Sequence, residues 1–179
     1  METKKEFLQQ LKSIEKMKLV NINFVRGLGI VEPRFELSFA NQSDSIILEV
    51  ETNIRIRTRS SHLLSFNDLY LNQKRKTISV RMFRQQKNIE KTYLFEALNC
   101  SNVLLKNKTV NKVVVKEYGD IFIMFSNGTT IEIFNDTHMQ EAALYRIITN
   151  GNYKEIIECY LDNNVLKYSY RDYDNWLIV

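Results

Sequence analysis

The stretch KVVVKEYGDIFIMFSNGTTIEIF, residues 112–134, decides the fold class of this chain. Two of its segments, 121–125 and 130–134, are rich in β-branched and aromatic residues, as β-strands are. Between them lies Asn127-Gly128, a strong hairpin signal because both residue types tolerate positive φ angles. The stretch therefore predicts an antiparallel β-hairpin.

A similar hairpin is predicted earlier in the chain. The segments 35–39 and 46–50 alternate apolar with polar residues, and the loop between them is polar. Such alternation is typical of an antiparallel sheet with one apolar and one charged face. Each hairpin is followed by a related triplet, centred on Arg55 in the first case and on Arg146 in the second. We interpret the resemblance as a weak internal duplication.

The first residues predict a short amphipathic helix that ends near Lys18. Apolar residues recur at helical spacing from Phe7 to Met17, with lysine and glutamate on the opposite side. Thr3 and Glu6 match a capping box, in which the two side chains satisfy backbone N–H groups of the first turn. We expect this helix to dock on the sheet of its own chain, and docking on another protein is the alternative.

The remaining segments give weaker patterns. Residues 20–24 alternate like a strand, and so do residues 165–170. The composition of 139–148 permits a helix, whereas the duplication makes its second half a strand, and 153–161 reads as helical. The prediction is an α+β fold with an N-terminal helix, a mostly antiparallel sheet and two pseudo-duplicated β units.

Length and composition predict one compact domain, 1–179, with 19–95 and 96–179 as the halves of the duplication. A chain of 179 residues buries roughly 70% of the surface that its unfolded form exposes, so it needs no disulfide or metal to fold. One proline and five glycines leave little material for a flexible linker.

The sequence predicts a cytoplasmic protein that does not enter a membrane. Its N-terminus is charged where a signal peptide would be apolar, and no apolar run approaches the ~18 residues of a membrane-spanning helix. The two cysteines are too few for a disulfide scaffold. A bias toward lysine, asparagine and isoleucine favours a bacterium-like source.

The residues that most often perform catalysis are sparse. His62, His138, Cys100 and Cys159 are the only histidines and cysteines, and none lies in a nucleophile elbow or a cysteine-protease signature. Their spacing does not fit a zinc site. We therefore expect no catalytic residues, no metal and no cofactor.

Asp44 together with Glu49 and Glu51 resembles the acidic half of a metal-dependent nuclease strand. The lysine that would complete such a site is missing after Glu51. We expect Glu49 and Glu51 instead to face arginines of the following segment, Arg55, Arg57 or Arg59, as cross-strand ion pairs.

Charge is distributed unevenly along the chain. Residues 54–91 carry 10 basic and 2 acidic side chains, a net of +8, although the whole chain has a net charge of only +4. Basic and aromatic residues together suit nucleic acid, because phosphates bind the cations and bases stack on the rings. A solvated face or a patch for an acidic protein accounts for them equally well. The basic candidates for partner binding are Arg55, Arg57, Arg59, Lys74, Arg75, Lys76, Arg81 and Arg84.

A second candidate region lies near the C-terminus. Tyr168, Tyr170, Tyr173 and Trp176 stand among aspartates there. Tyrosine and tryptophan carry much of the binding energy in protein interfaces, although some of these rings are expected to be core.

The 112–134 stretch, with Asn135, Asp136 and Glu141 after it, resembles a pattern of small bacterial β-rich proteins. In that pattern a strand, a Gly-Asp turn, a hairpin and an acidic loop precede an element containing tryptophan. Leu144 to Arg146 stand here where the tryptophan is usual. Several families with this pattern resemble immunity proteins of bacterial toxin systems, and the resemblance implies no catalytic residues.

Taken together, the sequence predicts a non-enzymatic protein-binding module. The resemblance implies a specific form of this function, an immunity protein that masks the active site of a toxin. The alternative is a nucleic-acid-binding protein that uses the basic segment 54–91. A hydrolase with an unrecognised site is the third reading.

Overall fold

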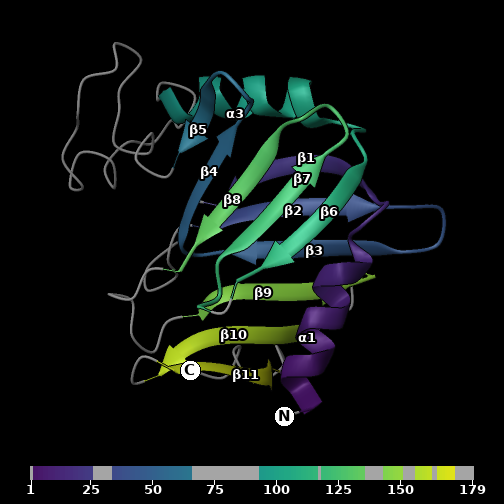
Figure 1. Cartoon of the computed structure of the whole chain (residues 1–179), viewed down its shortest axis with the longest axis vertical. Coiled ribbons are helices and arrows are strands. Elements are labelled where there is room, and N and C mark those ends of the chain that lie inside the picture. Colours follow the sequence, from purple (N-terminus) through teal and green to yellow (C-terminus); the bar gives the residue numbers. More distant parts are fainter. Residues whose placement is uncertain are drawn as a thin grey trace.

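Two antiparallel sheets and two helices make up the described part of the chain (Figure 1). The structure is a computed structural model, and it describes residues 2–25, 34–65, 93–116, 118–135, 143–150, 156–162 and 165–171. The helices are α1 (Glu2–Ser13) and α3 (Tyr93–Leu105). The α+β class predicted from the sequence is confirmed, and neither described helix is long and apolar enough to cross a membrane.

The six-stranded sheet contains, in spatial order, β1 (Lys18–Val25), β2 (Arg34–Ala40), β3 (Ser45–Val50), β9 (Ala143–Thr149), β10 (Ile156–Asp162) and β11 (Val165–Arg171). The five-stranded sheet contains β5 (His62–Ser65), β4 (Asn53–Arg57), β8 (Thr130–Phe134), β7 (Ile121–Phe125) and β6 (Val110–Val115). Every pairing between neighbouring strands is antiparallel.

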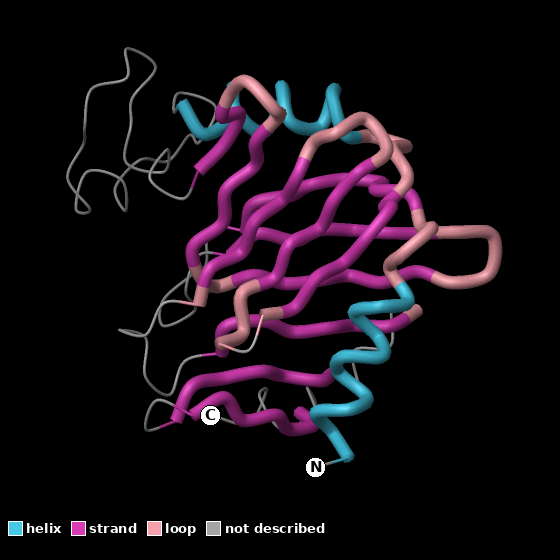
Figure 2. Tube along the Cα trace, in the orientation of Figure 1, coloured by secondary structure: helices cyan, strands magenta, loops and turns pink. Residues whose placement is uncertain are grey.

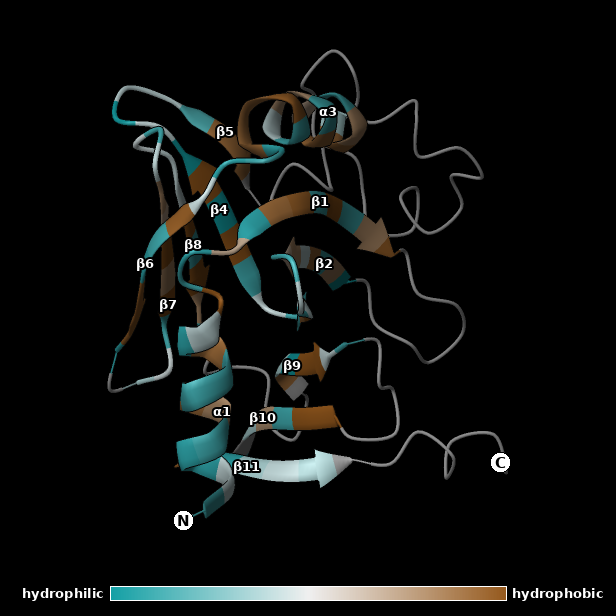
Figure 3. Cartoon of the chain, turned by 90° about the vertical axis from the view of Figure 1, so that its right-hand side faces the viewer, coloured by the Kyte–Doolittle hydropathy of each residue, from teal (hydrophilic) through white to brown (hydrophobic). Residues whose placement is uncertain are grey.

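The two sheets lie face to face, and their facing sides form a shared core (Figure 3). Leu37 and Leu48 of the six-stranded sheet and Ile123 and Ile131 of the five-stranded sheet are completely buried in it. Removing each such side chain from water stabilises the fold by about 1.5–3 kcal/mol. Alternate residues of the same strands point outward, so each sheet has an apolar inner face and an outer face that carries charged residues.

The order of elements repeats along the chain. Helix α1 is followed by a three-stranded meander, β1 to β3, in the six-stranded sheet, and then by β4 and β5 in the five-stranded sheet. Helix α3 is followed by the meander β6 to β8 in the five-stranded sheet, and then by β9 and β10 in the six-stranded sheet. Strand β11 follows the second unit. The predicted duplication thus corresponds to a repeat of topology in which the two sheets exchange roles.

The two units meet through symmetric backbone contacts just after their helices. Lys16 N–H donates to the Val110 carbonyl at 2.8 Å, and Asn107 N–H donates to the Leu19 carbonyl at 2.7 Å. Lys16 and Asn107, which occupy equivalent places, both have positive φ angles of 73° and 62°. The contacts are reciprocal between the two units, so the repeat extends to the hydrogen bonding of the junction.

Each helix protects an edge strand of the other unit (Figure 2). From α3, the Asn102 side chain accepts from Ile22 N–H at 2.7 Å and donates to the Ile22 carbonyl at 2.8 Å. From α1 and the turn after it, Glu15 accepts from Val113 N–H at 2.8 Å and Lys12 donates to the Val113 carbonyl at 2.6 Å. The exposed edges of β1 and β6 are thereby covered, which hinders pairing with other chains.

Several sequence predictions were wrong in detail. The first helix begins at or before Glu2, so Thr3 lies inside it and is not its cap, and it ends at Ser13. The segment 153–161 was expected to be helical, but from Ile156 onward it is strand β10, because it pairs with two neighbours that supply the hydrogen bonds a lone segment would lack.

Strand β1 departs from simple alternation. Its register shifts between Leu19 and Asn21, so Leu19 and Ile22 are buried while Val20 is 43% exposed. A bulge of this kind inserts one residue and reverses the facing of those before it. In the ambiguous 139–148 segment, the strand expected from the duplication is confirmed as β9, and 165–170 is confirmed as β11.

Candidate interaction surface

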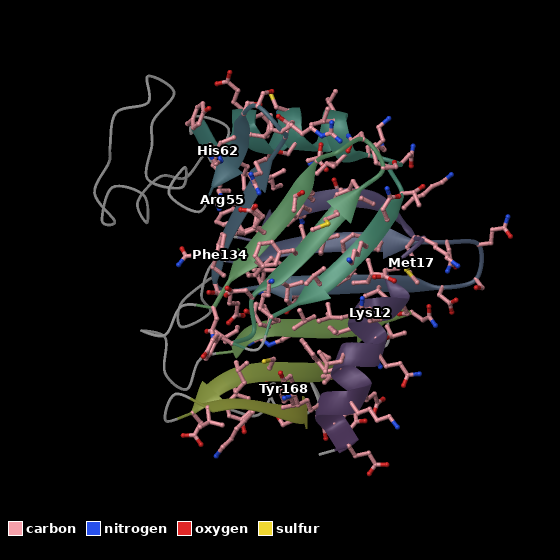
Figure 4. The ribbon with its side chains drawn as sticks, viewed as in Figure 1. Lys12, Met17, Arg55, His62, Phe134 and Tyr168 are labelled. Carbon is pink, nitrogen blue, oxygen red and sulfur yellow. The ribbon has the colours of Figure 1, made fainter. Side chains whose placement is uncertain are left out.

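The outer face of the five-stranded sheet carries the two arginines of β4 beside aromatic residues of β7 and β8. We call this set the arginine surface, and it consists of Arg55, Arg57, Phe122, Met124, Glu132 and Phe134. Arg55 and Phe134 lie side by side on the sheet that faces the viewer in Figure 4. Strand alternation places all six residues on the side opposite the core.

A single buried carboxylate organises the two arginines. The Glu132 side chain is 1% exposed and forms ion pairs with both Arg55 and Arg57, whose side chains are 39% and 49% exposed. Arg55 Nε donates to Glu132 Oε2 at 2.7 Å, and Arg57 Nε donates to the other carboxylate oxygen. Glu132 thus neutralises one of two positive charges and holds both guanidinium groups at the surface.

Aromatic rings continue the surface beside the arginines. The Arg55 guanidinium lies 5.0 Å from the centre of the Phe134 ring, which is within cation–π range. The Phe122 ring meets Phe134 edge to face at 6.2 Å, and Met124 is 38% exposed on the same strand as Phe122. Arginine and large apolar side chains are the types enriched in protein interfaces.

Cations stand at both ends of this surface. Arg57, Thr130, Met124 and Lys112 occupy one row across four neighbouring strands. With strands about 4.8 Å apart, the two ends of the row are separated by about 14 Å. The surface therefore has an apolar centre between positive ends.

The internal repeat provides a comparison for this surface. Arg146 on β9 is cross-strand partner of Glu49 on β3, just as Arg55 on β4 is cross-strand partner of Glu132 on β8. Arg146 is mostly buried and forms ion pairs with Glu49 at 3.3 Å, with Glu158 at 2.7 Å and with Glu51. The glutamate–arginine pair is thus common to both units, which is what a structural role predicts.

The neighbours of the shared pair differ between the units. Glu51 lies two residues after Glu49, and Phe134 lies two residues after Glu132. Glu158 pairs in register with Arg146, whereas Ser65 pairs in register with Arg55. Glu36 pairs in register with Glu49, and Phe122 pairs in register with Glu132, so Glu36 and Phe122 are also at equivalent positions. The fold therefore forms with carboxylates at these positions as well as with rings, so it does not require Phe122 and Phe134 there.

The expected pairing of the early glutamates was wrong. Glu49 and Glu51 face Arg146, not Arg55, Arg57 or Arg59, because the chain crosses from one sheet to the other between Val50 and Asn53. Local alternation cannot reveal such a crossing. Arg59 lies beyond the end of β4 in an exposed bend, so only Arg55 and Arg57 of these three candidate residues lie on that strand.

The other predicted binding residues are not brought to the arginine surface by the described part of the chain. Lys74, Arg75, Lys76, Arg81, Arg84, Tyr173 and Trp176 lie outside the described residues. Tyr168 and Tyr170 lie on β11 of the other sheet. The Tyr168 ring packs 5.2 Å from Phe7, and Tyr170 donates a hydrogen bond to Glu6 while remaining 55% exposed.

Four members of the arginine surface were not predicted as binding residues. Phe122, Met124, Glu132 and Phe134 were recognised only as parts of a hairpin. The signal was present, because each alternates with a core isoleucine or phenylalanine and so had to face outward. What the sequence did not reveal was that β4 would lie next to β8.

The reactive residue types are dispersed. His62 is exposed at the start of β5, and His138 lies outside the described residues. Cys100 is exposed on α3, whereas Cys159 is buried and burial raises its thiol pKa to about 12. Among the residues that the structure describes, no group of three or more His, Cys, Asp or Glu side chains could hold a metal ion.

The chain matches no protein-family model, no curated protein and no solved structure.

Proposed function

We propose that this chain is a non-enzymatic protein-binding module and that the arginine surface contacts its partner. The observation that carries the proposal is a difference between the two units at equivalent positions. Phe122 and Phe134 stand outward at positions where the other unit folds with glutamates, so their exposure is not a requirement of the fold. Rings and arginines in one surface supply the contacts that dominate protein interfaces.

A nucleic acid is the alternative partner, and Glu132 argues against it. Backbone phosphates would approach Arg55 and Arg57 from the same side as a buried carboxylate that already neutralises one of their charges. Affinity for nucleic acid grows with the number of phosphates that uncompensated cations contact. Arg55, Arg57 and Glu132 together retain a single positive charge, which is enough for one carboxylate but not for a row of phosphates. A protein partner gains from the apolar centre, Phe122 and Met124, and needs only local charge complementarity.

Neutralisation of a bacterial toxin is one form that this function takes in the families that the 112–134 stretch resembles. In this chain the stretch supplies β6, β7 and β8, including most of the apolar part of the arginine surface. A toxin whose active site is covered by that surface would be inhibited by exclusion of its substrate. This specific form is part of the proposal.

The proposal is tested by two matched substitutions of exposed apolar residues. Met124→Glu places a negative charge in the centre of the arginine surface, and Val165→Glu makes the same change on β11, where Val165 is 59% exposed. Each tagged variant and the wild type are purified from source cells. We expect a protein that co-purifies at 1:1 with the wild type and with Val165→Glu but is lost with Met124→Glu.

Reconstitution from purified components then excludes an indirect association. Light scattering of the mixture should give the mass of a 1:1 complex for the wild type and Val165→Glu only. Equal binding by Met124→Glu, with its folded spectrum intact, would contradict the proposal. So would a nucleic acid, retained at low salt and released steeply with added salt, in place of a protein.

A further inference from the structure

The comparison of Arg55 with Arg146 also indicates what the arginine surface binds. Arg146 contacts three carboxylates of its own chain, those of Glu51, Glu158 and Glu49, the last of which it shares with Arg34. Arg55, its equivalent, contacts one carboxylate among the described residues, that of Glu132, and shares it with Arg57. One unit therefore satisfies its arginine internally, whereas the other keeps positive charge at the surface.

The donors that remain on the two surface arginines are suitably placed for a second carboxylate. The Glu132 carboxylate accepts hydrogen bonds from Nε and one terminal nitrogen of Arg55 and from Nε of Arg57. The other terminal nitrogens, one on Arg55 and both on Arg57, donate no hydrogen bond to any residue that the structure describes. Their side chains are 39% and 49% exposed, so these donors can be reached from solvent.

The arginines are also held in place before any ligand arrives. Arg55 is fixed by Glu132 on one side and by the Phe134 ring at 5.0 Å on another. Because its side chain already has a defined position, little rotamer entropy remains to be lost on binding. Planar guanidinium groups match carboxylates with paired hydrogen bonds, which a flexible lysine does not.

We propose that Arg55 and Arg57 together bind an aspartate or glutamate side chain of the partner protein. The partner's carboxylate lies beside Arg55 on its β5 side. This is the position that the Glu158 carboxylate of β10 has beside Arg146 in the other unit. Register supports this place, because Arg55 pairs in register with Ser65, whereas Arg146 pairs in register with Glu158. Apolar side chains elsewhere in the partner's interface contact Phe122 and Met124, which lie on β7 beyond β8. This inference rests on the proposed function, of which it specifies the partner's chemistry.

The test uses small probes and needs no identified partner. Nitrogen-15-labelled protein is titrated with a blocked glutamyl-leucyl-glutamate peptide and, separately, with its glutaminyl counterpart. The Nε–H signals of Arg55 and Arg57 should shift with the glutamyl peptide and stay unchanged with the glutaminyl one. Arg57→Gln should weaken glutamyl-peptide binding about tenfold, the effect of losing one charge-assisted contact.

Lys112→Gln is the matched control for charge. It removes one exposed cation from the far end of the same row, and it should change affinity for the glutamyl peptide by less than about twofold. If Arg57→Gln does not fold, the inference is tested by comparing the two peptides on the wild type and on Lys112→Gln. Equal shifts with both peptides, or none with either, would overturn the inference.

Three further outcomes show which of the two proposals fails. A short oligothymidylate that shifts the same arginine signals at lower concentration than the glutamyl peptide would overturn the carboxylate site in favour of phosphate. Selective glutamyl-peptide binding together with equal partner capture by Met124→Glu would leave the carboxylate site standing and refute the proposed function. Loss of the partner with Met124→Glu and no response to the peptides would do the reverse.

Discussion

Residues of the same type differ in reactivity according to how deeply the fold buries them. Cys100 and Cys159 are the clearest pair, since one is exposed on α3 and the other lies in the core beside Tyr168. The thiolate is the reactive form of cysteine, and burial raises the Cys159 pKa to about 12. The same thiol would react normally in the unfolded chain.

We therefore predict that iodoacetamide at pH 8 modifies Cys100 of the folded protein and leaves Cys159 intact. Peptide mass spectrometry of digests from native and urea-unfolded samples measures the difference. The unfolded chain serves as the control and should be modified at both cysteines. Modification of Cys159 at the same rate as Cys100 under native conditions would contradict the assigned burial.

Glu51 shows how the crowded carboxylates around Arg146 affect stability. Burial, together with the neighbouring charge of Glu49, raises the Glu51 pKa, although Arg146 acts in the opposite direction. Because its folded-state pKa lies above the unfolded value near 4.5, the folded chain binds more protons between the two values. This group therefore stabilises the fold most at low pH, and that contribution is lost as pH rises through the folded pKa.

The prediction concerns Glu51→Gln, measured by urea unfolding across pH 4 to 8. Arg146 retains Glu49 and Glu158 in this variant, so the free energy of unfolding at pH 7 should fall by less than about 1 kcal/mol or rise. Relative to the wild type, the variant should gain stability as pH increases above about 4.5. A variant that loses stability relative to the wild type over that range would show that the ionised carboxylate is favoured by folding.

The two helices, with the turn after the first, place polar side chains against the backbone of edge strands. Asn102 pairs with both backbone groups of Ile22 from α3, and residues of α1 and its following turn do the same for Val113. These contacts link the two units in both directions. They also mean that polar side chains of a helix or of the turn after it, not an added strand, bind the backbone of Ile22 and Val113 at these edges.

Replacing Asn102 by alanine should uncover the edge of β1. Loss of both bonds to Ile22 is expected to cost about 1–3 kcal/mol, measured by chemical denaturation, and to accelerate hydrogen exchange of the Ile22 amide. Asn99→Ala on the exposed side of α3 is the matched control and should change stability by less than about 0.5 kcal/mol. Equal effects of the two substitutions would contradict the edge-covering role.

Sequence patterns predicted some elements well because their signals are local. The hairpin of β7 and β8 follows from Asn127-Gly128, and the strand assignment of β9 follows from its likeness to the segment around Arg55. Helix α3 was not predicted. Its buried residues have helical spacing, but the central Asn99-Cys100-Ser101-Asn102 run consists of poor helix formers that favour turns.

The neighbours of each arginine are decided by where the chain crosses from one sheet to the other. Two crossings, between β3 and β4 and between β8 and β9, place Arg55 beside Glu132 and Arg146 beside Glu49. The sequence contains the residues of the candidate site but not their neighbours, because those pairings join segments 77 and 97 residues apart. The two-unit plan then gives one arginine a buried role and leaves its counterpart at the surface.

We propose that the arginine surface, on the outer face of the five-stranded sheet, contacts a protein. The most direct measurement is photo-crosslinking in source cells with a photoreactive amino acid in place of Met124 or, as the control, of Val165. We predict one discrete protein adduct from position 124 and none from position 165. The same adduct from both positions, an adduct from position 165 alone, or a nucleic-acid adduct from position 124 would contradict the account.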